Sequence, residues 1–178
     1  MPEGQSDAVP QLGSTGNLAA SDLFDQAEAY RQSAATLQSA GLDHYLSPLP
    51  VRNLYYTSIE LYLKAHLRAH GHSIDELEGK YRRDFRRMRK RCISLGLVVT
   101  PAQDATLEYF VRTPVSVRTK FSSTQYYSAP EINELDDLCQ MLRSHISALL
   151  RPDTDNQSGK IAGAGTTVDV HRKAQDKP

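Results

Sequence analysis

The 178-residue sequence predicts an all-α fold: an antiparallel bundle of about five helices between disordered tails. Apolar side chains recur every three or four residues along several segments, which is the spacing of a buried helix face. Residues that favour helix starts, and glycines that favour helix ends, bracket these segments. No run of β-forming residues bounded by turn residues indicates a strand, except the stretch VSVRTKFS at 115–122.

The first helix is predicted to begin after Ser21, which can cap it, and to end at Gly41. Asp22 and Asp25 in its opening turn suit the positive end of the helix dipole. Its inward stripe contains small residues that permit close helix approach. The stripe consists of Leu23, Ala27, Tyr30, Ala34 and Leu37.

The second helix is predicted over about residues 49–70 and ends at Gly71, which gives it a length of about 33 Å. Apolar residues, together with Ser58, recur at helical spacing over a wide part of its circumference, so we expect neighbouring helices on two sides. These residues are Val51, Leu54, Tyr55, Ser58, Ile59, Leu61, Tyr62, Leu63, Ala65 and Ala69.

Three further segments carry helix-start signals. Ser73 and Glu76 have the spacing of a capping box and predict a short helical turn. A basic segment at about 80–95 follows and is closed by Gly96. Thr100 and Pro101 then mark the start of a helix that stops before Pro114.

The last helix is predicted to begin at a capping box formed by Ser128 and Glu131. Its opening turns are acidic, and Arg143 and Arg151 lie near its end, as the helix dipole favours. Its inward residues are Leu135, Leu138, Leu142, Ile146 and Leu149.

Residues 1–17 and 152–178 are small, polar and without periodicity, so we expect disordered tails around one folded domain at 18–151. The N-terminus lacks the basic and apolar regions of a signal peptide, and the longest helix carries charges throughout. Cys92 and Cys139 both lie in apolar stripes, which is typical of reduced thiols. We therefore expect a cytoplasmic protein that makes no membrane contact.

The chain has 21 basic and 21 acidic side chains and no net charge, so any affinity for nucleic acid must be local. Eight Lys and Arg side chains nevertheless lie between Lys80 and Arg91. On a helical wheel, Arg83, Arg86, Arg87 and Lys90 lie opposite the apolar stripe, with Arg82, Arg89 and Arg91 on the flanks. The apolar stripe consists of Tyr81, Phe85, Met88, Cys92 and Leu95.

Two interpretations of this segment remain open. Acidic residues of the same chain could neutralise it, namely Asp75, Glu76, Glu78 and those of EINELDD at 131–137. Alternatively, the segment binds phosphate, because the planar guanidinium of arginine matches phosphate geometry.

The stretch YYTSIELYLKAHLRAHGHSIDEL at 55–77 resembles the hallmark helix of HEPN domains (higher eukaryotes and prokaryotes nucleotide-binding). Glu60, Leu63, Lys64, Ala65 and Leu67 match the family pattern. The segment YRRDFRRMRKRCISLGL is similar to the next family element, with Arg83 in the place where His is common. RTKFSSTQYY, before the last helix, is similar to the Arg-containing loop of many members. The resemblance covers about residues 20–150.

The resemblance implies a compact helical bundle, commonly dimeric, in toxin–antitoxin and RNA-processing systems. Active members of the family are metal-independent ribonucleases that use an Arg-x4–6-His motif. No Arg in the predicted folded region is followed by His at that spacing. The positions after Arg118 hold Ser, Thr and Gln, which cannot act as general bases near neutral pH. We therefore expect no catalysis by the family's route.

Three histidines lie close together in the sequence. His66 and His70 are four residues apart on one predicted helix, a spacing that can hold a metal ion, and His72 follows. However, the pair lies beside Ile59 and Leu63, where helix contacts are expected, and Leu67 stands where a zinc-protease motif has Glu. We interpret these histidines as structural and expect neither a metal site nor another cofactor.

The loop at 112–127 is long for a compact domain, which favours a functional role. Arg112, Arg118 and Lys120 give it a second basic cluster. A loop that contacts a second subunit is an equally good interpretation.

These observations predict a homodimeric helical module that binds an anionic partner, RNA or a nucleotide, and has no catalytic residue of the standard kind. A diverged ribonuclease from a toxin–antitoxin or defence system, with an antitoxin-like partner, is one alternative. A module that docks an acidic protein is another. The predicted nucleic-acid-binding residues are Arg82, Arg83, Arg86, Arg87, Lys90, Arg112, Arg118 and Lys120.

Overall fold

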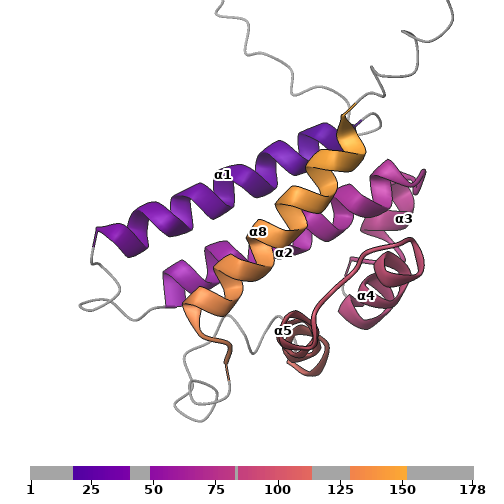
Figure 1. Ribbon diagram of the computed structural model, residues 1–178. Coiled ribbons are helices and arrows are strands. Elements are labelled where there is room, and N and C mark those ends of the chain that lie inside the picture. The colour runs from indigo at the N-terminus through magenta and orange to yellow at the C-terminus, as the bar shows by residue number, and fades with distance from the viewer. Residues whose placement is uncertain (1–17, 41–48, 83, 114–128, 152–178) are drawn as a thin grey trace, which may run out of the picture.

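The computed structural model describes residues 18–40, 49–82, 84–113 and 129–151. These residues form helices and no strand, which confirms the predicted all-α bundle (Figure 1). The predicted tails, Gly41 and the loop residues 114–128 lie outside the described residues. The helices are α1 (Ala20–Ser39), α2 (Leu49–Ala69), α3 (Ile74–Glu78), α4 (Phe85–Ser94), α5 (Pro101–Arg112) and α8 (Ile132–Leu150).

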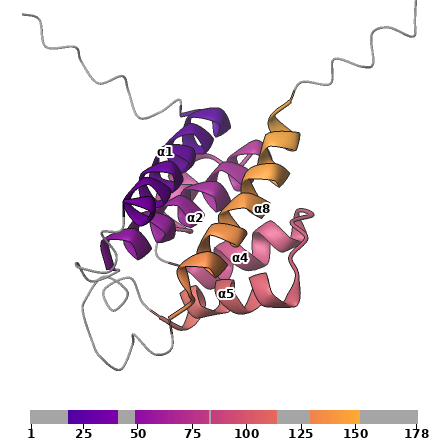
Figure 2. The ribbon, with the colours of Figure 1, turned by 60° about the vertical axis from the view of Figure 1, so that its left-hand side comes forward.

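Helix α2 lies at the centre of the bundle and contacts α1, α8 and α4. Figures 1 and 2 show α1, α2 and α8 side by side. Helices α4 and α5 pack against each other, α4 also against α2 and α5 also against α8. The predicted coverage of α2 on two sides is therefore confirmed. Within the described residues, no helix is both long and apolar enough to cross a bilayer.

Contacts at the helix ends define the chain directions. Arg68 Nε, in the last turn of α2, donates to Leu18 O just before α1 at 2.9 Å, so α1 and α2 are antiparallel. Arg52, in the first turn of α2, donates to the carbonyl of Pro130 just before α8. Helices α2 and α8 therefore run in the same direction, because α3, α4 and α5 return the chain to the level where α2 began.

The closest approach of α1 to α2 uses small side chains, as the sequence predicts. Ala27 and Ala34 are fully buried. Ser58 on α2 is also fully buried, and its hydroxyl donates to Ala27 O at 2.9 Å. This hydrogen bond gives the buried Ser58 hydroxyl an acceptor, and the Cys139 thiol donates to the same hydroxyl oxygen at 3.7 Å.

The helix-end predictions are confirmed at most sites. Ser73 and Glu76 form the capping box of α3, and Thr100 forms one with Gln103 at the start of α5. Gly71 follows α2 with a φ of 86°, and Gly96 follows α4 with a φ of 95°. Both values lie in the left-handed region that glycine tolerates without a Cβ clash.

Two helix starts differ from the predictions. Helix α1 begins before Ser21, because the Ala19 amide donates to the Asp22 carboxylate at 2.8 Å. Helix α8 begins at Ile132, because the Glu131 amide donates to the Glu134 carboxylate at 2.8 Å. In both cases a carboxylate in the first turn satisfies the free backbone N–H ahead of the helix.

Three residues predicted to face inward are exposed: Tyr30, Ala69 and Leu149. In the turn of α1 that holds Tyr30, it is Arg31 that contacts α8, through Asp136 at 3.6 Å. Tyr30 therefore lies at the edge of the contact between the two helices and is exposed to solvent. Leu149 lies in the final turn of α8, beyond Ile146, which is fully buried.

Candidate nucleic-acid interface

Helix α4 carries most of the basic segment and begins at Phe85, not at Lys80 as predicted. Asp84 caps it, since its carboxylate accepts from the Arg87 amide at 2.8 Å. Aspartate is among the best N-cap residues because its side chain satisfies a backbone donor of the first turn. Tyr81 is outside the helix but is buried all the same.

The apolar side of α4 faces the bundle as predicted. Phe85, Met88 and Cys92 are buried. Phe85 stacks on Phe110 of α5, with ring centroids 4.8 Å apart. Leu95 is only partly buried, and Leu97 takes the buried place after the Gly96 turn. These contacts fix the rotation of α4 and hence the direction of its charged side.

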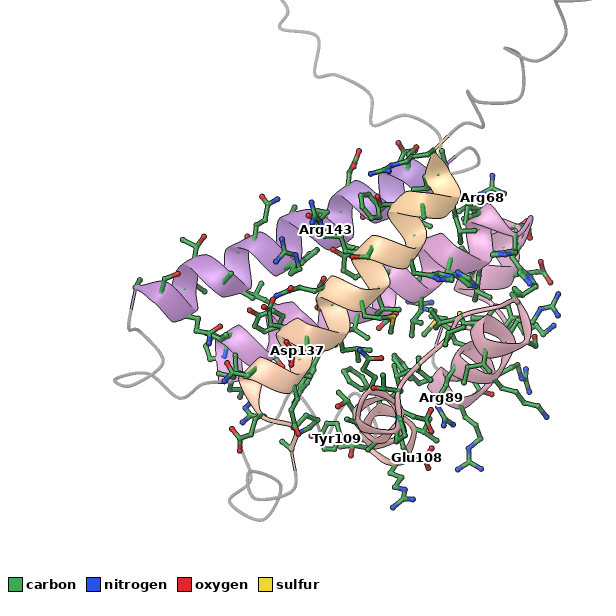
Figure 3. All side chains as sticks on the ribbon, in the orientation of Figure 1. Arg68, Arg89, Glu108, Tyr109, Asp137 and Arg143 are labelled. Atoms are coloured by element: carbon green, nitrogen blue, oxygen red, sulfur yellow. The ribbon has the colours of Figure 1, made fainter. Side chains whose placement is uncertain are left out.

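Five basic residues are exposed on the other side of α4 and just before it; we call them the basic face. They are Arg82, Arg86, Arg87, Lys90 and Arg91. Figure 3 shows long side chains with nitrogen ends extending outward from α4. The helical-wheel assignment is therefore confirmed for Phe85, Met88 and Cys92 on the buried side and for Arg86, Arg87 and Lys90 on the exposed side.

Arg89 is the basic residue of α4 that the protein neutralises internally. Its Nε lies 3.0 Å from Asp104 Oδ1 and its Nη1 lies 3.3 Å from Glu108 Oε2, both on α5. Figure 3 labels Arg89 and Glu108 at this contact between the two helices. Its side chain is 21% exposed, so water screens the pairs less than on an open surface.

Each residue of the basic face forms fewer ion pairs with the described residues than Arg89 does, and those pairs are more exposed. Arg87 lies 3.4 Å from Asp84, and Arg82 lies 4.0 Å from Glu78. Both pairs are exposed, and exposed ion pairs contribute little to stability. The side chains of Arg86 and Lys90 make no ion pair or hydrogen bond with any other described residue.

The acidic residues of the last helix do not neutralise the basic segment. Glu131 lies 4.0 Å from Arg52, and Asp136 lies 3.6 Å from Arg31. Of the acidic residues predicted as partners, Glu78 contacts the basic face through Arg82. The internal neutralisation of α4 comes instead from Asp104 and Glu108, which the sequence does not single out.

Of the remaining predicted binding residues, the structure describes Arg112 alone. Arg112 lies in the last turn of α5, and its Nε is 3.1 Å from Glu108. Arg83, Arg118 and Lys120 lie outside the described residues. The structure therefore assembles Arg82, Arg86, Arg87 and Lys90 into one surface and leaves Arg112 apart from it.

A histidine cluster lies between α2 and α8. His66 is fully buried, and its ring centroid is 4.4 Å from that of His70 and 5.1 Å from that of His145. Burial, reinforced by the charges of His70 and His145, lowers the pKa of His66 to about 4, although the nearby backbone of Cys92 favours its protonated form. Sequence reasoning missed His145, because nothing in the spacing connects it with His66.

The described residues offer little for metal or thiol chemistry. None of their groups of three or more His, Cys, Asp or Glu has the geometry to hold a metal ion. Cys92 and Cys139 are free thiols, and burial raises the pKa of each to about 12. Thiols with such pKa values carry almost no nucleophilic thiolate near neutral pH.

One hollow in the described part of the chain lies between α5 and α8 and has a volume of about 140 Å³. Sites that enclose small ligands usually measure about 300–1,000 Å³. The hollow is therefore too small to enclose a nucleotide. Its lining residues are Thr100, Ala102, Gln103, Thr106, Glu134 and Asp137.

No protein-family model, no curated protein and no solved structure matches this chain.

Proposed function

We propose that this chain is a HEPN-like helical module that binds RNA through the basic face of α4. The observation that carries the proposal is the position of Arg86 and Lys90, one helical turn apart on the exposed side of α4, without an anionic partner among the described residues. Residues four apart on a helix lie about 6 Å from each other, which suits contacts with successive phosphates.

Charge repulsion supports a phosphate ligand. The basic face gathers five cations on and just before a helix of ten residues, and Asp84 and Glu78 oppose only two of them, in exposed pairs. Like charges this close repel one another unless an anion lies between them. The buried side of α4 holds the helix in place despite this repulsion, so an approaching polyanion meets cations that are already oriented.

The contact should involve the RNA backbone and not the bases. Base recognition in single strands uses exposed aromatic rings for stacking. Both aromatic residues of this segment, Tyr81 and Phe85, are buried. A surface of arginine and lysine without exposed rings favours binding that depends on salt and is nearly independent of sequence.

The proposal is binding without cleavage by the standard HEPN route, since the Arg-x4–6-His motif is absent. As in the family that the chain resembles, we propose a homodimer in the cytoplasm. The hollow between α5 and α8 is too small to enclose a nucleotide, so we favour a polynucleotide on the basic face over a free nucleotide.

The test is a titration of a fluorescent single-stranded RNA, followed by anisotropy, at salt concentrations from about 50 to 200 mM. The wild-type protein should bind, and the logarithm of its affinity should fall linearly with the logarithm of salt concentration. Each lost phosphate contact should reduce that slope by about 0.7. The double variant Arg86→Gln/Lys90→Gln should therefore reduce it by about 1.4.

The control is Arg143→Gln/Arg151→Gln, which removes the same charge from exposed positions on and next to α8, where Arg143, unlike Arg86, pairs with a carboxylate, that of Glu28, at 3.1 Å. This control should leave the slope unchanged. Equal loss of binding in both double variants would refute a specific role of α4. Binding of an acidic protein with no binding of RNA would favour the protein-docking alternative, and cleavage of the labelled RNA would favour the diverged-nuclease alternative.

A further inference from the structure

His72 connects the turn after α2 with the basic face. Its Nδ1 lies 3.1 Å from Glu76 Oε2 on α3. Its Nε2 lies 3.1 Å from Arg91 Nε on α4. The two ring nitrogens of His72 therefore link α3, through Glu76, to α4, through Arg91.

The chemistry of the two partners defines the protonation state of His72. Hydrogen bonding to the Ser73 amide, then to His72, lowers the pKa of Glu76, so this carboxylate is ionised and accepts hydrogen bonds. Arginine only donates hydrogen bonds. His72 must therefore donate from Nδ1 and accept at Nε2. This is a neutral imidazole, because a protonated ring would place an N–H of its own against the N–H of Arg91.

Few other groups face His72. Arg68 of α2 donates from Nη1 to the His72 backbone carbonyl at 3.2 Å. The Tyr81 ring lies edge-on at 5.5 Å, between α3 and α4. With Glu76 and Arg91, these are the charged and titratable groups that contact it within the part of the chain that the structure describes. The His72 side chain is 11% exposed, but its contact with Arg91 lies at the surface, where water can solvate Nε2 once Arg91 leaves.

We propose that proton uptake by His72 breaks its contact with Arg91, which frees the guanidinium of this basic-face residue for phosphate and so strengthens RNA binding. The inference rests on the proposed function of that face. Protonation turns Nε2 into a donor, which repels the Arg91 guanidinium and leaves the contact with Glu76 intact as an ion pair. Arg91 lies one helical turn after Arg87, so its released side chain extends the row of cations along α4.

Thermodynamic linkage makes this coupling reciprocal. If proton uptake by His72 strengthens RNA binding, RNA binding must favour proton uptake by His72 to the same extent. Couplings between two sites usually change an affinity about 5-fold to 150-fold. Release of a single arginine corresponds to the lower end, so we expect RNA binding to tighten about fivefold through this route.

The test measures RNA affinity at about pH 8 and about pH 5.5, a range in which imidazoles gain protons, at constant salt concentration. His72→Gln is the informative variant, because its amide oxygen can accept from Arg91 at every pH and so imitates neutral His72. Wild-type affinity should increase at the lower pH about fivefold more than that of His72→Gln. His70→Gln, the same change at an exposed histidine nearby, should behave like the wild type.

Arg91→Gln completes the test, since it removes the residue that His72 is proposed to release. In an Arg91→Gln background, His72→Gln should no longer alter the pH dependence. Circular dichroism at both pH values confirms that each variant is folded.

Equal pH dependence in the wild type and His72→Gln would overturn the proposed linkage and leave the proposed function standing. An effect of His72→Gln that persists in the Arg91→Gln background would also overturn it. Absence of RNA binding by the wild type at both pH values would overturn the proposed function, and the linkage with it.

Discussion

Lowering the pH from about 7.5 to about 5 should reduce the free energy of unfolding by about 2 kcal/mol through His66 alone. Burial lowers the pKa of His66 from its ordinary 6.5 to about 4 in the folded protein. The unfolded chain therefore takes up this proton first as the pH falls. The contribution of His66 to the free energy of unfolding is fully present above about pH 6.5 and is lost progressively as the pH falls to about 4.

The magnitude follows from the pKa difference. At about pH 5 the unfolded imidazole lies about 1.5 pH units below its pKa, and the folded imidazole is still mostly neutral. Each unit corresponds to 1.36 kcal/mol, which gives about 2 kcal/mol. His145 adds to the effect in the same direction, because burial and then the charge of His70 lower its pKa as well.

The assay is urea unfolding at several pH values for the wild type and for His66→Leu. Leucine fills a similar volume and removes two buried ring nitrogens that have no hydrogen-bond partner among the described residues. The variant should be about as stable as the wild type at neutral pH and should lose about 2 kcal/mol less on acidification. If His66→Leu keeps the full acid sensitivity of the wild type, the reasoning from burial is refuted.

Three further outcomes are expected. Arg89→Gln should lower the free energy of unfolding by about 1 kcal/mol in urea, because it leaves Asp104 without its cation and Glu108 with Arg112 alone, whereas Arg86→Gln should change it little. Cys92 and Cys139 should not react with a thiol reagent at about pH 8 in the folded state, and both should react in denaturant, because burial raises the pKa of each to about 12; rapid native-state labelling would contradict this. Gly96→Ala should lower stability by about 1 kcal/mol in thermal melts, because alanine resists the φ of 95° even though its Cβ would meet no atom within 4 Å.

Periodicity was sufficient to predict the two sides of α4. Phe85, Met88 and Cys92 are buried, and Arg86 and Lys90 are exposed, because a 3.6-residue repeat dictates which residues share a face once one side is anchored. The capping boxes of α3 and α5 were predictable for a similar reason. Both depend on residues only three positions apart, so no tertiary contact is needed to form them.

Contacts between distant segments could not be predicted in the same way. The pairing of Arg89 with Asp104 and Glu108 depends on how α5 packs against α4, and His145 reaches His66 only because α8 runs in the same direction as α2. The sequence contains several acidic residues that could pair with the basic segment, and it does not show which of them lie close to it in the fold. Nothing local connects Arg91 with His72, since the contact spans the turn that follows α3.

The central position of α2 also determines which parts of the molecule open first. Neighbours cover α2 on several sides, whereas α4 contacts α2 along one side and α5 along another. Amide protons of α2 should therefore exchange with solvent only when the whole domain unfolds, and those of α4 should exchange through local opening. The helix that carries the basic face thus belongs to a less protected cooperative unit, which can rearrange around a ligand while α1, α2 and α8 stay assembled.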